Sequence, residues 1–254
     1  MMKTFDSAGV RIAYIDEAPA DTRATILLIH GFASNVATNW GATGWIRELV
    51  HAGYRVVAFD NRGHGESEKL YELADYGAPA MSEDARRLLE FLQIPSAHVM
   101  GYSMGARITA FLALRHPQLV KTAVFGGLGI NMVRGMAGTG PIAHALEAPT
   151  MDDVKNPTAR TFRAFAEQTK SDLRALAACI RSAREPITAE ALGKLTCPVL
   201  VAVGSGDVVG GSAEELAAVI PGAEAFVIAD RDHMKAVGDR SYKRAVIEFL
   251  ARQS

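Results

Sequence analysis

Short apolar runs alternate with amphipathic segments along most of the chain. Five such runs end at Gly, Asp or a turn: residues 25–29, 54–59, 98–100, 122–125 and 199–203. Continuous runs of this kind are typical of parallel strands that are buried on both faces. Between them, apolar residues recur at helical spacing in residues 82–92, 104–115, 212–220 and 240–252. With an expected hairpin over residues 3–16, the alternation predicts a doubly wound, mostly parallel sheet with helices on both faces.

Residues 130–194 break this alternation, because they contain no convincing strand. Helices are expected to begin at Asn156-Pro157 and at Ser171-Asp172, and a short one to end at Gly193. An apolar face runs through this interval, formed by Phe162, Phe165, Leu173, Leu176 and Ile180. The sequence therefore predicts one core domain, residues 1–129 and 195–254, with an inserted helical lid over residues 130–194.

Composition narrows the class of protein without naming a function. The chain has 254 residues, of which 49% are apolar and 22% charged, as in an ordinary soluble domain with a sizeable core. The net charge is −1 and no basic block occurs, so neither nucleic acid nor a stable membrane association is expected. Because no long apolar run and only two cysteines, Cys179 and Cys197, are present, the expected location is the cytoplasm.

One short stretch suggests chemistry: GYSMGA, residues 101–106, lies between an apolar run and a helical pattern. In an open parallel sheet, ligands bind beyond the carboxyl ends of the strands, which is where Ser103 is expected. A sharp turn brings the positions two before and two after the serine close together, so Gly101 and Gly105 avoid side-chain clashes. The pattern favours a mounted nucleophile, while a flexible turn in a glycine-rich chain is the alternative.

A serine hydroxyl needs a base and the base needs an orienting carboxylate. Of seven histidines, His233 lies in a loop between the apolar residues 225–229 and the last helix, at the same edge of the sheet as Ser103. A solvated loop histidine is the alternative. Asp207 follows the run 199–203 and reaches that edge too, whereas Asp232 is nearer His233 in sequence only.

These motifs together resemble the α/β-hydrolase superfamily over nearly the whole chain outside the lid. The resemblance rests on His30-Gly31-Phe32, the turn of residues 60–67, the glycine-flanked Ser103, and the loops of Asp207 and His233. It implies an eight-stranded sheet, with Ser103, Asp207 and His233 as nucleophile, acid and base. It also implies an oxyanion hole formed by the N–H groups of Phe32 and Met104, and scaffold roles for His30, Arg62, His64 and Glu66. The Phe32 side chain is expected either in the pocket or in the core.

The substrate depends on the lid, where two interpretations remain open. Residues 126–140 contain six glycines with Met132 and Met136, and form either a floppy connection or a mobile apolar cover that binds substrate. Arg134 and His144 are candidates to meet a substrate carboxylate, with solvation as the alternative. No metal or phosphate-binding motif occurs, and the chemistry that the resemblance implies requires no cofactor.

The resemblance implies a serine hydrolase, of the carboxylesterase type, with a small-molecule ester as its partner. Lactonase or C–C bond hydrolase activity is the alternative within the superfamily, and a receptor-like binding module with negligible turnover is the alternative outside catalysis. The sequence leaves the oligomeric state open.

Overall fold

Eight strands form one twisted sheet in the computed structural model, which describes residues 2–135, 139–182 and 185–253. The strands are β1 (Lys3–Ser7), β2 (Val10–Glu17), β3 (Ala24–Ile29), β4 (Tyr54–Phe59), β5 (Ala97–Tyr102), β6 (Val120–Gly126), β7 (Val199–Gly204) and β8 (Glu224–Ile228). Their order across the sheet is β1-β2-β4-β3-β5-β6-β7-β8. The hairpin β1–β2 is antiparallel and β2 pairs antiparallel with β4, while all other pairs are parallel. The predicted doubly wound, mostly parallel sheet is confirmed.

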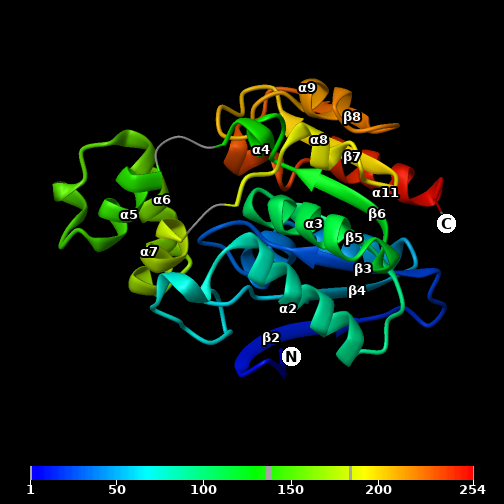
Figure 1. Cartoon of the computed structure of the whole chain (residues 1–254), viewed down its shortest axis with the longest axis horizontal. Coiled ribbons are helices and arrows are strands. Elements are labelled where there is room, and N and C mark those ends of the chain that lie inside the picture. The colour runs from blue at the N-terminus through cyan, green and yellow to red at the C-terminus, as the bar shows by residue number, and fades with distance from the viewer. Residues whose placement is uncertain (1, 136–138, 183–184, 254) are drawn as a thin grey trace.

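Helices cover both faces of this sheet because the apolar strands have no solvated face. One face packs against α2 (Ala78–Phe91), α3 (Met104–Arg115), α8 (Ala189–Leu192) and α9 (Ala213–Ala218). The other face packs against α1 (Trp45–His51) and α11 (Arg240–Ala251), where Trp45 and Tyr242 meet edge to face. Figure 1 shows α2 and α3 side by side in front of the sheet. The central strands are thereby fixed, and their carboxyl ends lie at one edge.

A group of helices is inserted between β6 and β7. It comprises α4 (Asn131–Arg134), α5 (Thr139–Glu147), the 3₁₀ turn η4 (Met151–Asp153), α6 (Pro157–Gln168) and α7 (Leu173–Arg181). The expected helix starts are confirmed, because Asn156 and Asp172 each accept a backbone N–H at 2.9 Å as N-caps. Figure 1 shows α5, α6 and α7 as a separate cluster beyond one end of the sheet. These three helices pack around their own apolar cluster, which also takes in Phe32 and Tyr76 from the core.

The glycine-rich segment after β6 is closely packed at Gly126 and Gly129 and exposed at Gly135. A Cβ on Gly126 would lie 2.2 Å from the Tyr242 hydroxyl, and one on Gly129 would lie 2.3 Å from the Ser212 carbonyl. Close approach of neighbouring groups therefore requires glycine at these two positions. The segment continues into α4, and α5 begins at Thr139.

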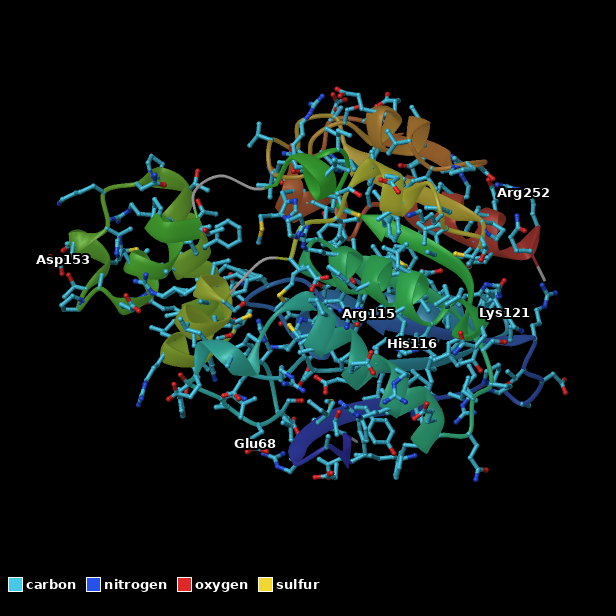
Figure 2. The ribbon with its side chains drawn as sticks, in the orientation of Figure 1. Glu68, Arg115, His116, Lys121, Asp153 and Arg252 are labelled. Atoms are coloured by element: carbon cyan, nitrogen blue, oxygen red, sulfur yellow. The ribbon has the colours of Figure 1, made fainter. Side chains whose placement is uncertain are left out.

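Several short elements complete the fold outside the expected pattern. They are the π-helical turn η1 (Ala37–Gly41), the 3₁₀ turns η2 (Leu73–Asp75) and η3 (Pro117–Leu119), and the one-turn helix α10 (His233–Ala236). Charged side chains of both signs lie around the periphery, as Figure 2 shows for Lys121, Asp153 and Arg252, which are exposed. Among the described residues, no helix has the length and apolar character needed to cross a membrane.

Candidate active site

Ser103 occupies a strained turn between β5 and α3. Its backbone has φ 56° and ψ −114°, a left-handed conformation that costs a non-glycine residue about 1–3 kcal/mol. The flanking glycines make this turn possible: a Cβ on Gly101 would lie 2.1 Å from the Gly105 carbonyl oxygen, and one on Gly105 would lie 1.9 Å from the Ile29 carbonyl oxygen. Gly101 is thus required by the turn itself, whereas Gly105 is required by the neighbouring strand β3.

The three residues singled out in the sequence lie together at the carboxyl edge of the sheet. His233 Nε2 lies 3.0 Å from Ser103 Oγ, and His233 Nδ1 lies 2.7 Å from Asp207 Oδ2. Asp207 follows β7, and His233 is the first residue of α10 after β8. The Asp207 side chain is fully buried and that of His233 is 11% exposed, so the pair is shielded while Ser103 remains accessible from a cavity. The solvated-loop alternative for His233 is wrong.

Asp207 is held by more than the histidine. Its Oδ1 accepts the N–H groups of Val209 at 2.9 Å and Gly210 at 2.8 Å, which leaves Oδ2 for His233. Asp232 has a different place: it is the N-cap of α10 and accepts the N–H groups of Met234 and Lys235. Those hydrogen bonds, chiefly that of the Lys235 N–H, lower the pKa of Asp232. Proximity in sequence to His233 is therefore no guide to contact with its ring.

The N–H groups of Phe32 and Met104 belong to two segments that lie next to Ser103. Phe32 follows β3 in the loop against which the Ser103 turn packs, and Met104 is the first residue of α3. Among the described residues, neither N–H group has an acceptor. The N-terminus of α3, beside Ser103, favours negative charge.

A buried polar scaffold supports the Phe32 loop. His30 Nδ1 lies 2.7 Å from the Gly31 carbonyl, and the Asn61 N–H donates to His30 Nε2 at 2.9 Å. This pattern assigns a neutral His30 that carries its proton on Nδ1. Burial lowers the pKa of His30 to about 4, and burial together with neighbouring His30 lowers that of His64 to about 3. Neither ring is within hydrogen-bonding distance of Ser103, and Arg62 is paired with buried Asp84 at 2.7 Å.

Two contacts around the site carried no sequence signal. The Tyr102 hydroxyl donates to the His233 carbonyl at 2.6 Å. This hydrogen bond connects α10 to the residue that precedes Ser103. Asn39 Oδ1 accepts the Gly31 N–H at 3.0 Å and so holds the loop before Phe32. These contacts join residues 131 and 8 positions apart along the chain. Only the fold brings them together, so no local pattern could have indicated them.

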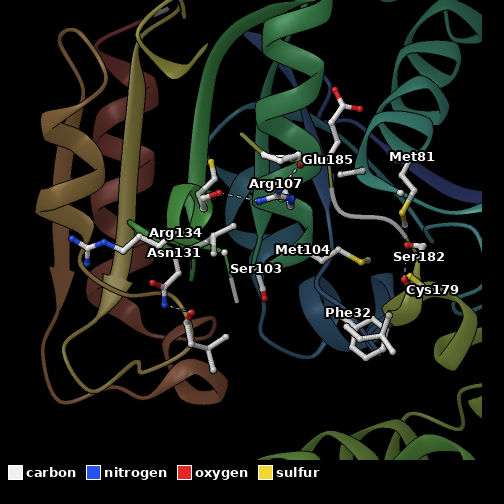
Figure 3. A pocket seen from close by; sticks show the side chains of 18 of the residues that line it. Phe32, Met81, Ser103, Met104, Arg107, Asn131, Arg134, Cys179, Ser182 and Glu185 are labelled. Atoms are coloured by element: carbon white, nitrogen blue, oxygen red, sulfur yellow. Dashed lines mark hydrogen bonds between the residues drawn. The ribbon is translucent and has the colours of Figure 1, made fainter. Parts of the chain in front are cut away.

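The candidate substrate residues divide into those that line a cavity and those that do not. Phe32 is 9% exposed and lines the cavity at Ser103. It also packs on Phe162 of α6, with ring centroids 6.1 Å apart. Met132 is buried and lines the same cavity, whereas Met136 lies outside the described residues. Arg134 lines its rim but pairs with Glu215 at 2.5 Å, and Figure 3 shows it pointing away from Ser103. His144 is exposed on α5 and does not line the cavity, so the suggestion that it meets substrate there is wrong.

In the described part of the chain, no three His, Cys, Asp or Glu side chains converge as metal ligands would.

Comparison with known proteins finds similar chains and similar structures. A family model described as the alpha/beta hydrolase fold matches residues 24–141, which contain the Phe32 loop and the Ser103 turn. A hydrolase from Pseudomonas aeruginosa PA01 superposes over 98% of both chains with a TM-score of 0.81 and 24% identity. The chain has the α/β-hydrolase fold.

One similar sequence and one similar structure carry named activities. The rhodomycin D methylesterase DnrP of Streptomyces peucetius is 36% identical over 112 residues, which is 43% of this chain. That match spans only 36% of the methylesterase, so the chain covers about a third of the length of this curated relative. The enol-lactonase from Burkholderia xenovorans LB400 is 18% identical, covers 98% of this chain and all of its own, and has a TM-score of 0.79. At 18% identity, this structural similarity shows that the two proteins share a fold.

Proposed function

We propose that this α/β-hydrolase cleaves carboxylic esters of small to medium acyl or alcohol groups, with Ser103 as nucleophile. The observation that carries the proposal is the hydrogen-bonded series in which His233 bridges Ser103 at 3.0 Å and Asp207 at 2.7 Å. A serine hydroxyl becomes nucleophilic only when a base accepts its proton, and this arrangement supplies the base together with the carboxylate that orients it. The name of the methylesterase relative agrees with ester chemistry.

The reaction follows from the placement of these groups. Ser103 Oγ attacks the ester carbonyl carbon while its proton passes to His233 Nε2, and the carbonyl oxygen becomes an oxyanion. The N–H groups of Phe32 and Met104 stabilise that oxyanion, and each such donor is typically worth about 3–4 kcal/mol. His233 then gives its proton to the departing alkoxide oxygen, and the acyl group remains on Ser103.

The second half of the reaction repeats the steps with water. His233 Nε2 accepts a proton from water, the hydroxide oxygen attacks the acyl carbon, and the C–O bond to Ser103 breaks as Ser103 regains its proton. Throughout, Asp207 stabilises the His233 imidazolium and keeps Nδ1 protonated. A lactone is a cyclic ester, so the same steps open its ring.

The proposal is tested with a fluorophosphonate probe and p-nitrophenyl esters on the full chain and on Ser103→Ala. The variant should lose labelling, and its kcat should fall roughly 10³- to 10⁶-fold with the fold intact, because triad members act as a unit. Ser96→Ala is the matched control, since Ser96 lies just before the amino end of β5, whereas Ser103 follows its carboxyl end. A folded Ser103→Ala protein that keeps most of its kcat would contradict the assignment.

A further inference from the structure

Two cavities of unequal size meet at Ser103. The larger has a volume of about 390 Å³ and the smaller about 160 Å³. Three residues border both of them, namely Phe32, Ser103 and Phe162. Of these two cavities, His233 lines the smaller and Met104 the larger. Ser103 therefore sits at the junction, with the proposed base on one side and the α3 N-terminus on the other.

The tetrahedral intermediate has four substituents, and this geometry gives each a direction. One is Ser103 Oγ, and the oxyanion points to the N–H groups of Phe32 and Met104. The leaving oxygen must lie within hydrogen-bonding reach of His233 Nε2 to receive its proton, so the alcohol extends on the His233 side. The acyl chain takes the remaining direction, away from His233 and into the cavity that Met104 lines.

We propose that the larger cavity binds the acyl group and the smaller cavity the alcohol, so the preferred substrates are esters of bulky acids with small alcohols. This inference rests on the ester hydrolysis proposed above and deepens it. A volume of about 390 Å³ lies in the range of pockets that enclose whole small-molecule ligands, about 300–1,000 Å³. The smaller cavity, at about 160 Å³, falls below that range.

The lining of the larger cavity selects an apolar acyl group. Figure 3 shows Met104 and Phe32 beside Ser103, with Met81 and Cys179 beyond them. Leu128, Met132 and Ile180 also line this cavity. Each methylene that enters such a surface should raise kcat/KM about fourfold until the cavity is full. Polar side chains line part of both cavities: Arg107, Asn131, Arg134, Ser182 and Glu185 in the larger one, and Ser34, Thr38, Asn39 and Thr43 in the smaller one.

Isomeric esters separate the two sites. Methyl octanoate and heptyl acetate have the same atoms, as do methyl phenylacetate and benzyl acetate, but the bulky group changes sides. The full chain is assayed with each pair by pH-stat, and kcat/KM is corrected for the rate of hydroxide hydrolysis. We expect the methyl ester of each pair to be preferred at least tenfold, about the effect of two buried methylenes.

Variants on each side should act selectively. Leu128→Trp, from a half-buried residue that lines only the larger cavity, should shift the optimum of the methyl ester series to shorter acids, and Met132→Phe should act likewise. Thr38→Leu should weaken the longer alkyl acetates without moving that optimum, because Thr38 lines only the smaller cavity. Lys121→Gln, at an exposed position on β6 outside both cavities, is the control.

Deacylation gives an independent readout, since the alcohol has already left the acyl-enzyme. In single-turnover experiments with p-nitrophenyl octanoate, Leu128→Trp should change the rate of octanoate release, whereas Thr38→Leu should not. Equal effects of both variants on this rate would overturn the assignment.

The decisive contrary result is a heptyl or benzyl acetate that is hydrolysed as well as its methyl isomer. A third cavity of about 240 Å³ shares Phe162, Phe165, His233 and Met234 with the smaller one, and that result would mean that the two act as one large alcohol site. Failure of every ester together with absent fluorophosphonate labelling would instead overturn the proposed function itself. The two failures are therefore distinguishable.

Discussion

At the scale of single residues, one missing methyl group allows the Ser103 turn to pack on the sheet. Gly105→Ala would place a Cβ 1.9 Å from the Ile29 carbonyl oxygen in buried backbone, which has no room to move. We expect a loss of about 3 kcal/mol or more in the free energy of unfolding, measured by urea denaturation. Gly140→Ala is the control: no atom lies within 4 Å of its Cβ position in α5, so up to about 1 kcal/mol of stabilisation is expected.

Two aspartates near His233 differ in what they touch, and their variants should differ accordingly. Asp207→Asn keeps the shape of the buried side chain but favours the wrong His233 tautomer, so kcat should fall on the order of 10³- to 10⁴-fold. Asp232→Asn should change the rate little, because Asn serves equally as the N-cap of α10. Steady-state hydrolysis of one p-nitrophenyl ester by both variants measures the difference, and the reverse order of effects would contradict the roles proposed here.

At the scale of elements, one arginine of α3 holds both ends of the helical insertion. Arg107 donates to the Met132 carbonyl at 3.0 Å, where the chain leaves the core, and to the Glu185 carbonyl at 2.5 Å, where it returns. Arg107→Met should therefore loosen α5–α7 relative to the sheet. We expect faster amide hydrogen exchange in these helices and a KM for long-chain esters that rises more than kcat falls.

The matched control for that variant is Arg115→Gln. Arg115 also lies on α3 and approaches Glu185, but through an exposed pair at 3.7 Å, which is worth at most about 1 kcal/mol. Its hydrogen exchange in α5–α7 should equal that of the unmodified chain. Equal exchange in both variants would show that the guanidinium of Arg107 does not restrain the insertion.

The elements show how far sequence patterns reach. The bounds of β4 and α3 match the expected ones residue for residue, because each is a continuous apolar or helical run with clear ends. The starts of α6 and α7 were also predictable, since Asn156 and Asp172 are local capping signals. In contrast, α5 was missed, because it begins Thr-Gly-Pro and local propensity argues against a helix. Packing of Ile142 and Leu146 in the apolar cluster of α5, α6 and α7 outweighs that propensity.

The candidate site shows the same difference between what local sequence patterns predict and what only tertiary contacts determine. The edge of the sheet at which Ser103, Asp207 and His233 meet was predictable, because the topology of an open parallel sheet places the ends of its strands together. The contacts that position them, such as Tyr102 to the His233 carbonyl, were not, since they depend on distances between side chains and distant backbone. The unequal cavities likewise arise where the insertion meets the core, and no segment contains that information by itself.

At the scale of the whole molecule, buried histidines make the free energy of unfolding depend on pH. His30 and His64 are fully buried with pKa values lowered to about 4 and about 3, and burial and Lys121 lower that of His98 to about 4. In the unfolded chain each ring has a pKa near 6.5 and binds a proton below that pH. In the folded protein the ring stays neutral until the pH reaches its lowered pKa. This contribution to stability is therefore complete above about pH 6.5 and is lost as the pH falls towards 4, on the order of 3 kcal/mol for His30.

His98→Asn tests this dependence away from Ser103. An asparagine amide can replace His98 Nδ1 in its 2.9 Å contact with Thr122 Oγ1, but it does not titrate. The variant should lose some stability at pH 7 because the side chain is smaller, yet its free energy of unfolding should fall less steeply between pH 6.5 and 4. Urea titrations at half-unit pH intervals measure that slope. A slope identical to that of the unmodified chain would mean that His98 is already protonated in the folded protein or that it stays unprotonated in the unfolded chain, and either result contradicts burial as the origin of its lowered pKa.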